Sequence, residues 1–560
     1  MTPSLSRCLP RAAATSPQTP HVALLDAFAG YVSSLLVHDG RRSRQRRLFH
    51  TYFVTHLPSS SLHPDSRLPV SGPVSGSVPT VTSPTVKATL TTPAVTRDLT
   101  VARIPLRSAK HHFGVASARG QRPYNEDTFQ AGTIDIPAFA KRAPISLVRS
   151  AVADSRSSGE GLTADSASGD PQIFYFAIFD GHGGQECSDF LRDELPAYIE
   201  AAAADFSLTS SLRRDRKGQA TRQIAKTAKT DTDTAEPKAI RLQRELLQEY
   251  RDTVGGYFRR FRPPSFDEST APRRASTTST TTSSPPSIDS VLTYAFLRAD
   301  LDFVTEQARK PDPDDPRVAD FPVNQDEVFG APHHRVPPSG NGIAGSPLRF
   351  KGGSTASVAL ISTPTAAPFW HPASRAGLLI AHVGDTRVLL CETATGLARP
   401  LTRDHHPSSP VEARRLTRFA ETLVTDSFGE ERISGLANSR AFGDMQSKRI
   451  GVSAEPELSP VDIAPAQYAF LVLVSDGVSG TLGDQEIVDL VKDARTPDQA
   501  ARAVVDFATE VSRDGDNATC LVVRLGGWER RSEGGLGSLG TKEIRDARLA
   551  EAQDPRRKRR

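Results

Sequence analysis

Several acidic side chains stand next to short apolar runs, at positions where a strand would begin or end. Asp180 closes the run IFYFAIF and is followed by Gly-His-Gly-Gly, which predicts that Asp180 and His182 lie in a bare turn at a sheet edge. Asp476 follows a second apolar run, Asp385 follows a third, and Asp516 precedes a fourth. Any one of these turns is explained as well by a solvent-exposed aspartate. Their repetition indicates that the carboxylates gather in space.

Gathered carboxylates repel one another unless a cation neutralises them, and hard divalent cations bound by oxygen are the usual solution. Glu126 and Asp127, close to Arg122 in RPYNED, add two carboxylates to the set. The expected donors are carboxylate and carbonyl oxygens, with no cysteine and little histidine. The sequence therefore favours Mg²⁺ or Mn²⁺ over Zn²⁺.

Short apolar runs bounded by turns predict the strands that must position these residues. They lie at 174–179, 354–361, 378–384, 388–392, 469–475 and 518–525. Helical periodicity marks 186–204, 240–261, 287–308 and 496–513. This order predicts one large domain of mixed α and β structure over 109–526. Polar or proline-rich stretches inside it predict surface insertions at about 207–239, 263–286 and 311–349.

The motifs in this domain resemble those of the metal-dependent protein phosphatases of the protein phosphatase 2C type. In chain order they are RPYNED, FDGHGG, GGSTAS, HVGDTR, TRDHHP, SRAFGD, VSDGVSG and GDNAT. The resemblance covers about 109–526. It implies an α+β fold, an α–β–β–α sandwich of two antiparallel sheets flanked by helices, and the activity of a protein-serine/threonine phosphatase, which is a hydrolase of phosphoric monoesters.

The resemblance also implies a centre in which two Mg²⁺ or Mn²⁺ ions activate a water molecule that attacks phosphorus. The assignments it carries over are Asp180 bridging both ions, the Gly181 carbonyl on the first ion, Asp476 and Asp516 on the second, and Glu126 and Asp127 holding metal-bound waters. Arg122 would bind the substrate phosphate through its planar guanidinium. His182 would protonate the leaving serine or threonine oxygen.

One position departs from the family pattern. Many members carry an acidic residue four positions after the aspartate of the SDG segment, where it holds a third ion together with the GDTR aspartate. Here Asp385 is present but the other position is Gly480, which makes a third ion doubtful. The alternative of a catalytically weak, phosphatase-like scaffold that binds a protein partner has Gly480 as its only support.

The composition limits the partners. The 560 residues are 37% hydrophobic and 24% charged with a net charge of +4, which allows a large core and does not by itself indicate a polyanion-binding protein. The four cysteines form no CxxC pair and fit a reducing compartment. A nucleic-acid-associated protein, suggested by the basic ends, would need interleaved aromatic residues that are missing. We expect a phosphoprotein substrate, no nucleic acid, no stable membrane insertion and a monomer.

The two ends of the chain suggest a location. Residues 1–50 are rich in arginine and serine and predict a mitochondrial transit segment, with a disordered basic arm as the alternative. A Ser/Thr/Pro-rich linker is expected over 51–108 and a basic tail with a solvated helix over 527–560. We expect the mitochondrial matrix, with a nuclear or cytosolic location as the alternative. Resemblance and location together suggest the pyruvate dehydrogenase complex as substrate.

Overall fold

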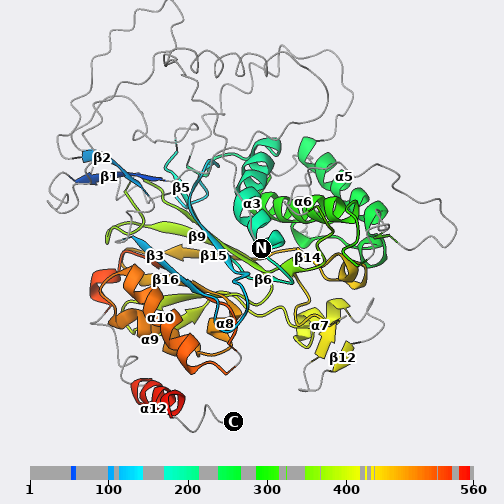
Figure 1. Cartoon of the computed structure of the whole chain (residues 1–560). Coiled ribbons are helices and arrows are strands. Elements are labelled where there is room, and N and C mark those ends of the chain that lie inside the picture. The colour runs from blue at the N-terminus through cyan, green and yellow to red at the C-terminus, as the bar shows by residue number, and fades with distance from the viewer. Residues whose placement is uncertain are drawn as a thin grey trace, which may run out of the picture. The chain divides into compact units, whose positions relative to one another are not determined.

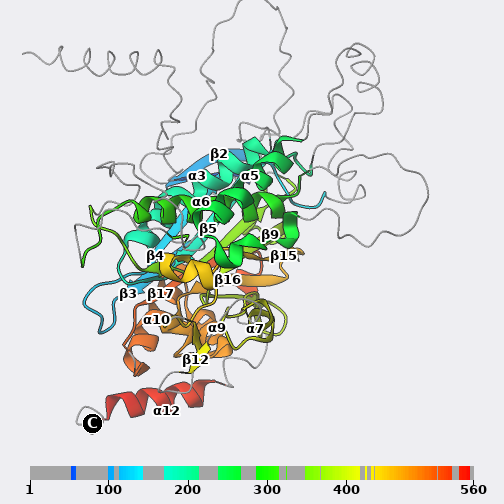
Figure 2. The same cartoon turned by 90° about the vertical axis from the view of Figure 1, so that its right-hand side faces the viewer.

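Two antiparallel sheets lie face to face between layers of helices (Figures 1 and 2). The structure, a computed structural model, describes residues 52–58, 99–105, 112–142, 170–212, 237–266, 286–314, 323–324, 347–365, 367–416, 423–425, 431–433, 435–513, 515–531 and 541–554. The predicted transit segment lies outside these residues, as does most of each predicted insertion. This architecture confirms the predicted α–β–β–α sandwich.

The first sheet has five strands and carries the first part of the candidate site. Its order is β15 (Glu457–Ile463), β9 (Ala376–Val383), β8 (Ala356–Ser362), β5 (Ile173–Phe179) and β4 (Thr128–Ile134). The second sheet also has five strands, in the order β11 (Ala398–Pro400), β10 (Arg387–Glu392), β16 (Tyr468–Val474), β17 (Ala518–Arg524) and β3 (Phe113–Ala118). All neighbouring strands in both sheets are antiparallel.

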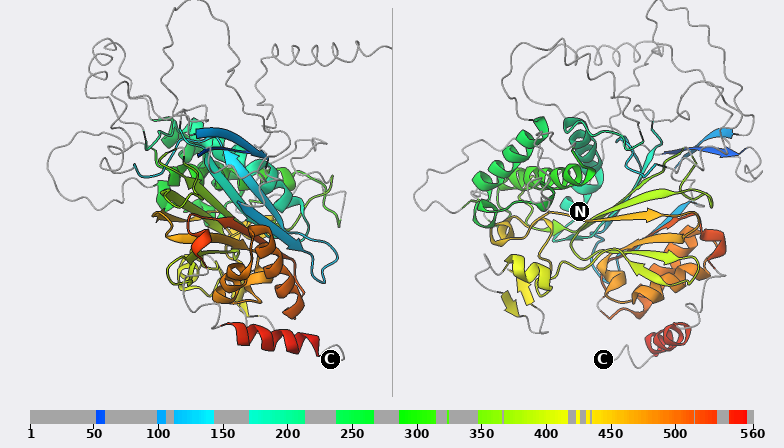
Figure 3. Two further views of the ribbon diagram at one scale, coloured as in Figure 1. Left: turned by 90° about the vertical axis from the view of Figure 1, so that its left-hand side faces the viewer. Right: turned by 180° about the vertical axis from the view of Figure 1, so that it is seen from behind.

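Helices cover the outer face of each sheet. On the first sheet they are α3 (Glu186–Asp205), α5 (Lys238–Thr253) and α6 (Ile288–Ala308); on the second they are α9 (Asp484–Asp493) and α10 (Pro497–Val511). A last helix, α12 (Lys542–Gln553), follows beyond α9 and α10 (Figure 3). Within the described residues, no helix is long and apolar enough to cross a bilayer.

The alternation of side chains along the central strands explains this layering. In β5, where all seven residues are buried, Tyr175 and Phe179 pack with α3 and α6, whereas Phe174 and Phe176 pack between the two sheets. In β16, Leu471 belongs to the core between the sheets, while its neighbours on the other face pack against α9 and α10. Because β5 and β16 are packed on both faces, their positions are fixed. The candidate site lies at their ends.

Shorter elements surround the edge of the sandwich. The short strands β6 (Gly181–His182), β7 (Gly353–Ser354) and β14 (Phe442–Gly443) form a small sheet, and two further pairs join β12 (Leu423–Thr425) to β13 (Glu431–Ile433) and β1 (Tyr52–Pro58) to β2 (Leu99–Pro105). The short helices are α7 (Pro410–Leu416), α8 (Asp476–Ser479), η4 (Gly256–Arg259), η5 (Pro264–Phe266), η6 (Met445–Ile450) and η7 (Trp528–Arg530).

The sequence analysis did not predict the strands β3, β4, β11 and β15 or the helix α9, and the structure differs from its predictions in two further places. The helix predicted over 240–261 ends at Thr253, because Gly255 and Gly256 adopt φ values of 69° and 49°, which a helix cannot continue through. The stretch predicted as a linker contains β1 and β2, which pair with each other in antiparallel register. The other predicted strands and helices each overlap an observed element.

Candidate metal centre

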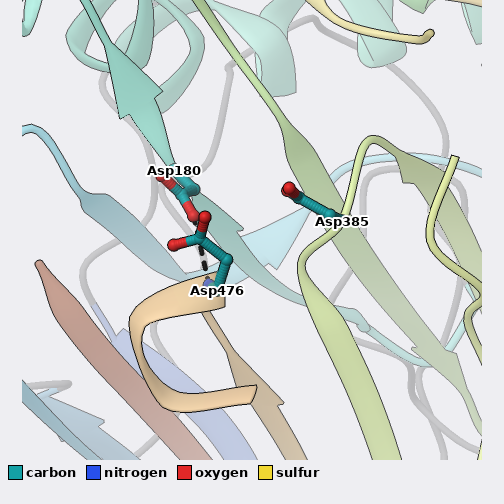
Figure 4. A group of neighbouring side chains, drawn as sticks. All are labelled: Asp180, Asp385 and Asp476. Carbon is teal, nitrogen blue, oxygen red and sulfur yellow. Dashed lines mark hydrogen bonds between the residues drawn. The ribbon is translucent and has the colours of Figure 1, made fainter. Parts of the chain in front are cut away.

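Asp180, Asp385 and Asp476 converge at one edge of the sandwich (Figure 4). Asp180 follows β5, Asp385 lies in the turn after β9, and Asp476 begins α8 directly after β16. One carboxylate oxygen from each residue lies within 4.8 Å of the corresponding oxygens of the other two. The backbone N–H of Asp476 donates to Oδ2 of Asp180 at 3.2 Å. We refer to these three residues as the acidic cluster.

Glycines allow the backbone segments to come this close. A Cβ on Gly477 would lie 1.9 Å from the carbonyl oxygen of Asn517, and a Cβ on Gly181 would lie 2.6 Å from that of Glu126. Any side chain at either position would therefore force these segments apart. Gly477 is what lets α8 lie against the segment that carries Asp516.

Asp516 is placed beside the acidic cluster rather than within it. Its charge is one of those that raise the pKa of Asp476, and its Oδ2 accepts a hydrogen bond from Nη2 of Arg122 at 2.8 Å. The same contact raises the pKa of Arg122. The side chain of Arg122 is 52% exposed, so it can still reach a ligand in solvent while Asp516 holds one of its nitrogens.

Asn517 connects the RPYNED segment to the strand that follows Asp516. Its Oδ1 accepts from the backbone N–H of Glu126 at 2.8 Å, and its Nδ2 donates to the carbonyl oxygens of Arg119 and Tyr124 at 2.9 and 3.1 Å. Sequence reasoning assigned no role to Asn517, although it follows Asp516 in the quoted motif. The sequence did contain one signal, an asparagine directly after a candidate metal ligand.

The two carboxylates of RPYNED have different surroundings. Oε1 of Glu126 accepts from the backbone N–H of Gly184 at 2.5 Å, which ties this residue to the turn after β6. Asp127 is buried, and its Oδ2 accepts from the hydroxyls of Ser475 and Thr519 at 2.8 and 2.7 Å. Burial raises the pKa of Asp127 to about 6.

Burial and mutual repulsion make the acidic cluster unfavourable as a set of free anions. Burial raises the pKa of Asp180 well above its ordinary value, and the charges of Asp476, Asp127 and Asp385 raise it further. The pKa of Asp476 rises to about 8, first through burial and then through Asp385, Asp516 and Asp127. The charges acting most strongly on both residues are those of other carboxylates, so a cation placed among them would be stabilising.

The side chains present fit a divalent cation. Oδ1 of Asp127 and Oδ1 of Asp385 are buried, and neither has a hydrogen-bond partner among the described residues. Such oxygens are costly unless something else satisfies them. The donors that converge here are carboxylate oxygens, which suit Mg²⁺ or Mn²⁺. The three described cysteines are buried in the two outer hydrophobic cores and are not among the converging ligand atoms.

Asp385 has a partner that the sequence did not suggest. Its Oδ2 accepts from Nδ2 of Asn438 at 2.8 Å. Gly480, where many members of the resembling family carry an acid, is exposed, and its N–H donates to the carbonyl of Asp476 at 2.6 Å. The resemblance implies a third ion held by Asp385 and an acid at position 480. Here that acid is missing, and Asp385 is instead held by Asn438. That the centre takes two ions rather than three stays a prediction.

His182 lies next to the acidic cluster and faces Asp444. Its Nε2 is 2.9 and 3.0 Å from the two carboxylate oxygens of Asp444, whose side chain is only 4% exposed. Burial lowers the pKa of His182, but the hydrogen bond and charge of Asp444 outweigh burial and raise it overall. The protonated ring is thus favoured, as a proton donor requires.

A buried ion pair fixes the backbone next to Asp444. Nζ of Lys448 lies 2.8 Å from Oδ1 of Asp300 in α6, and both side chains have 0% exposure. Oδ1 of Asp300 accepts from the backbone N–H of Gly443 at 3.0 Å, and Lys448 donates to the carbonyl of Ala441 at 2.7 Å. Asp444 itself has φ of 44°, an uncommon value for a residue with a side chain. The SRAFGD motif was noted in the sequence, but its aspartate was given no role.

Comparisons with known proteins identify the family of the chain. The profile of the family described as protein phosphatase 2C matches residues 341–516. Protein phosphatase 2C homolog 4 of Schizosaccharomyces pombe is 30% identical over 431 residues, which are 77% of this chain and 84% of that protein. A mitochondrial protein phosphatase 1K of Xenopus laevis is 36% identical over 152 residues, 27% of this chain and 40% of its own length.

Among solved structures the match is more distant. The crystal structure of serine-threonine phosphatase 2C from Toxoplasma gondii covers 74% of this chain and 94% of its own, with 17% identity and a TM-score of 0.39. At that score the family assignment rests on the sequence relatives.

Proposed function

Since the chain belongs to the protein phosphatase 2C family of metal-dependent serine/threonine phosphatases, we propose that it dephosphorylates phosphoserine and phosphothreonine in proteins at the acidic cluster, with two Mg²⁺ or Mn²⁺ ions. The observation that carries the proposal is the convergence of Asp180, Asp385 and Asp476, whose strongest charged neighbours include one another. Such a set is stable in its ionised form only with a cation.

The residues that would hold the ions come from three segments. Asp180 and the Gly181 carbonyl follow β5, Asp476 begins α8, and Asp516 lies beside it. Glu126 and Asp127 border the cluster, where they would accept hydrogen bonds from coordinated solvent. When bound, the ions would supply Lewis-acid activation of water and neutralise charge on the phosphoryl group.

Arg122 would bind the phosphate. Its guanidinium is held on one side by Asp516 and exposed on the other, so its remaining donors can meet two phosphoryl oxygens in a planar arrangement. The contact with Asp516 also places the guanidinium at the border of the acidic cluster. Arg122 thereby orients the phosphorus and offsets charge that develops on its oxygens.

His182 would donate a proton to the leaving oxygen of serine or threonine. An alkoxide is a poor leaving group at neutral pH, so protonation during bond cleavage lowers the barrier. The carboxylate of Asp444 stabilises the imidazolium and fixes the ring through Nε2, which leaves Nδ1 as the nitrogen that can face a substrate. Asp444 acts through His182 and is a positioning residue.

The location and substrate are proposed from composition and from one relative. The composition of residues 1–50 and the name of the mitochondrial relative from Xenopus both favour mitochondria. We place the protein in the matrix, where a phosphorylated enzyme such as the pyruvate dehydrogenase complex is the proposed substrate. A fusion of residues 1–60 to a fluorescent reporter tests the location, and a nuclear or cytosolic signal would contradict it.

The activity is tested with a phosphothreonine peptide. We expect phosphate release that requires Mn²⁺ or Mg²⁺ and is abolished in Asp476→Ala. Asp506→Ala is a suitable control, since Asp506 lies on α10 rather than at the acidic cluster. Metal binding without turnover in the unaltered chain would favour the alternative, a phosphatase-like scaffold.

A further inference from the structure

The C-terminal helix α12 is joined to the second sheet's helices mainly by polar contacts. Thr541, just before the helix, donates to Oδ2 of Asp489 at 2.7 Å, and Arg545 lies 3.5 Å from Asp493. Both acids belong to α9. Apolar packing at this contact is slight, since Ala552 is the α12 residue that packs against the core beneath. The sequence predicted a solvated helix here, and most of α12 is exposed, with Arg545 as its buried residue.

Arg548 connects this helix to the segment that carries Asp476. Its Nη1 lies 3.1 and 2.9 Å from the two carboxylate oxygens of Glu486, and its Nη2 donates to the carbonyl oxygen of Thr481 at 2.6 Å. Thr481 follows the single turn of α8, and its own N–H donates to the carbonyl of Val478 at 3.1 Å. One end of this short segment thus carries a candidate metal ligand and the other is bound by α12.

A second contact reaches the segment that carries Asp516. Arg513, shortly before Asp516, pairs with Glu551 of α12 at 3.0 Å. Ser512 accepts from the N–H of Gly515 at 3.1 Å and so shapes the same turn. A cavity of about 210 Å³ remains between these elements, lined by Gly480, Thr481, Val511, Ser512, Arg513, Arg548 and Glu551. Its presence means that side-chain hydrogen bonds, rather than close packing, hold α12 to the two segments.

We propose that α12 positions the metal centre, with Arg548 as the positioning residue that fixes the segment 476–481. An isolated helical turn is too short to be stable alone, so α8 depends on contacts at both ends. The N-terminal end is held by Asp180, which accepts from the N–H of Asp476. Arg548 binds a carbonyl at the C-terminal end, where a cation is favourable. This inference rests on the proposed function, because it takes Asp476 as a metal ligand.

The test measures Mn²⁺ binding to the full chain by isothermal titration calorimetry. Arg548→Ala should weaken Mn²⁺ binding by about threefold to tenfold. This is somewhat less than the loss typical for a residue that hydrogen-bonds directly to a metal-coordinating side chain. Arg545→Ala is the matched control, because it removes the same residue type from the same helix without touching Thr481. We expect its affinity to stay within about twofold of the unaltered chain.

Two further variants separate positioning from general stability. Arg548→Lys keeps a donor for the Thr481 carbonyl and should restore much of the affinity. In Glu486→Gln the charge of the ion pair is lost, but an acceptor for the N–H of Gly483 and the donor from Arg548 to Thr481 both remain. That chain should unfold at a lower temperature in EDTA while still binding Mn²⁺ within about twofold of the unaltered chain.

The outcomes are distinct. Equal Mn²⁺ affinity in Arg548→Ala and the unaltered chain would overturn the inference and leave the proposed function standing. Equal losses in Arg548→Ala and Arg545→Ala would overturn the assignment of the positioning role to Arg548, because the contact with Thr481 would then add nothing to the docking of α12 as a whole. An unaltered chain that binds no Mn²⁺ would overturn both proposals.

Discussion

This protein contains a half-buried group of carboxylates and a fully buried one, and their charges are handled in opposite ways. In the acidic cluster, carboxylates face carboxylates, and the pKa values of Asp180 and Asp476 rise. Glu412 on α7, 1% exposed, instead accepts from the guanidinium groups of Arg415 and Arg440, each at 2.7 Å, and from the hydroxyl of Ser439. Although burial opposes ionisation, the two arginines hold the pKa of Glu412 well below its usual range.

The difference shows which group is structural and which is functional. Glu412 is neutralised by the chain itself, and it holds together α7 and the segment that leads to Asp444. The acidic cluster is left with a charge imbalance that a ligand from outside can correct. Removing a carboxylate should therefore have opposite consequences for folding at the two places.

The largest effect is expected for Asp180→Asn. Turnover of a phosphothreonine peptide should fall by at least about 1000-fold, because a metal ion supplies several kcal/mol of transition-state stabilisation. The free energy of unfolding of the metal-free protein should stay the same or rise, since one repelling charge is gone and an amide oxygen can still accept from Asp476. Urea unfolding in EDTA measures this. A clear loss of stability would contradict the comparison.

The opposite result is expected for Glu412→Gln. Two buried guanidinium groups would lose their counter-charge, which typically costs about 3 kcal/mol or more. The midpoint of urea unfolding should fall with or without Mn²⁺. Glu245→Gln is a suitable control, because Glu245 lies in an exposed pair with Arg241 on α5. Stability equal to that of the control would mean that Glu412 is not the structural charge we take it to be.

The pH dependence of the free energy of unfolding of the metal-free protein should also distinguish the acidic cluster from Glu412. In the folded chain the pKa values of Asp476 and Asp127 are about 8 and about 6, whereas unfolded aspartates titrate near 4. The folded state then binds more protons, so its free energy of unfolding should fall as pH rises from about 5.5 to 8. Glu412, with a lowered pKa, keeps its contribution over this range and loses it only in acid.

Mn²⁺ should abolish this decline, since cation binding favours the ionised carboxylates. The measurement is thermal unfolding at several pH values in EDTA and in Mn²⁺. If the two series run parallel, the acidic cluster is not where the cations bind.

The smallest effect is expected for Asp444→Asn. Asp444 is a buried carboxylate, and its partner His182 is charged only when protonated. Hydrolysis of the phosphothreonine peptide should slow by about tenfold, because the imidazolium loses its stabilising anion. Hydrolysis of p-nitrophenyl phosphate should change little, since nitrophenolate leaves without a proton. Equal losses on both substrates would show that Asp444 supports the fold rather than the proton donor.

Much of the fold could be predicted because it depends on local patterns. The strands of both sheets have continuous or alternating apolar residues, and α10 begins with the Thr496–Pro497 pair that favours a helix start. The break after Thr253 was missed, since the periodicity of apolar residues continues past Gly255 and Gly256. Their positive φ values end the helix there, and a Cβ on Gly256 would lie 2.4 Å from the carbonyl oxygen of Arg449 in η6.

The candidate site was predicted as a set of residues and not as a geometry. The motif resemblance indicated Asp180, Asp385, Asp476 and Asp516, and the structure brings the first three to one point with the fourth beside them. Asn438, Asp444 and Asn517 were missed, because each acts through partners that lie far away along the chain. No periodicity or spacing connects such pairs.

By itself, the amino-acid sequence determined the two-layered apolar pattern, the oxygen-donor chemistry of the site and the family, because these depend on residue type and order. The tertiary structure alone decided which carboxylates lack a compensating charge and which are neutralised by arginine. It also decided that α12 reaches the segment carrying Asp476. The reason is distance along the chain: Asp180 and Asp476 are 296 positions apart, and only the packing of two sheets places the N–H of one against the carboxylate of the other.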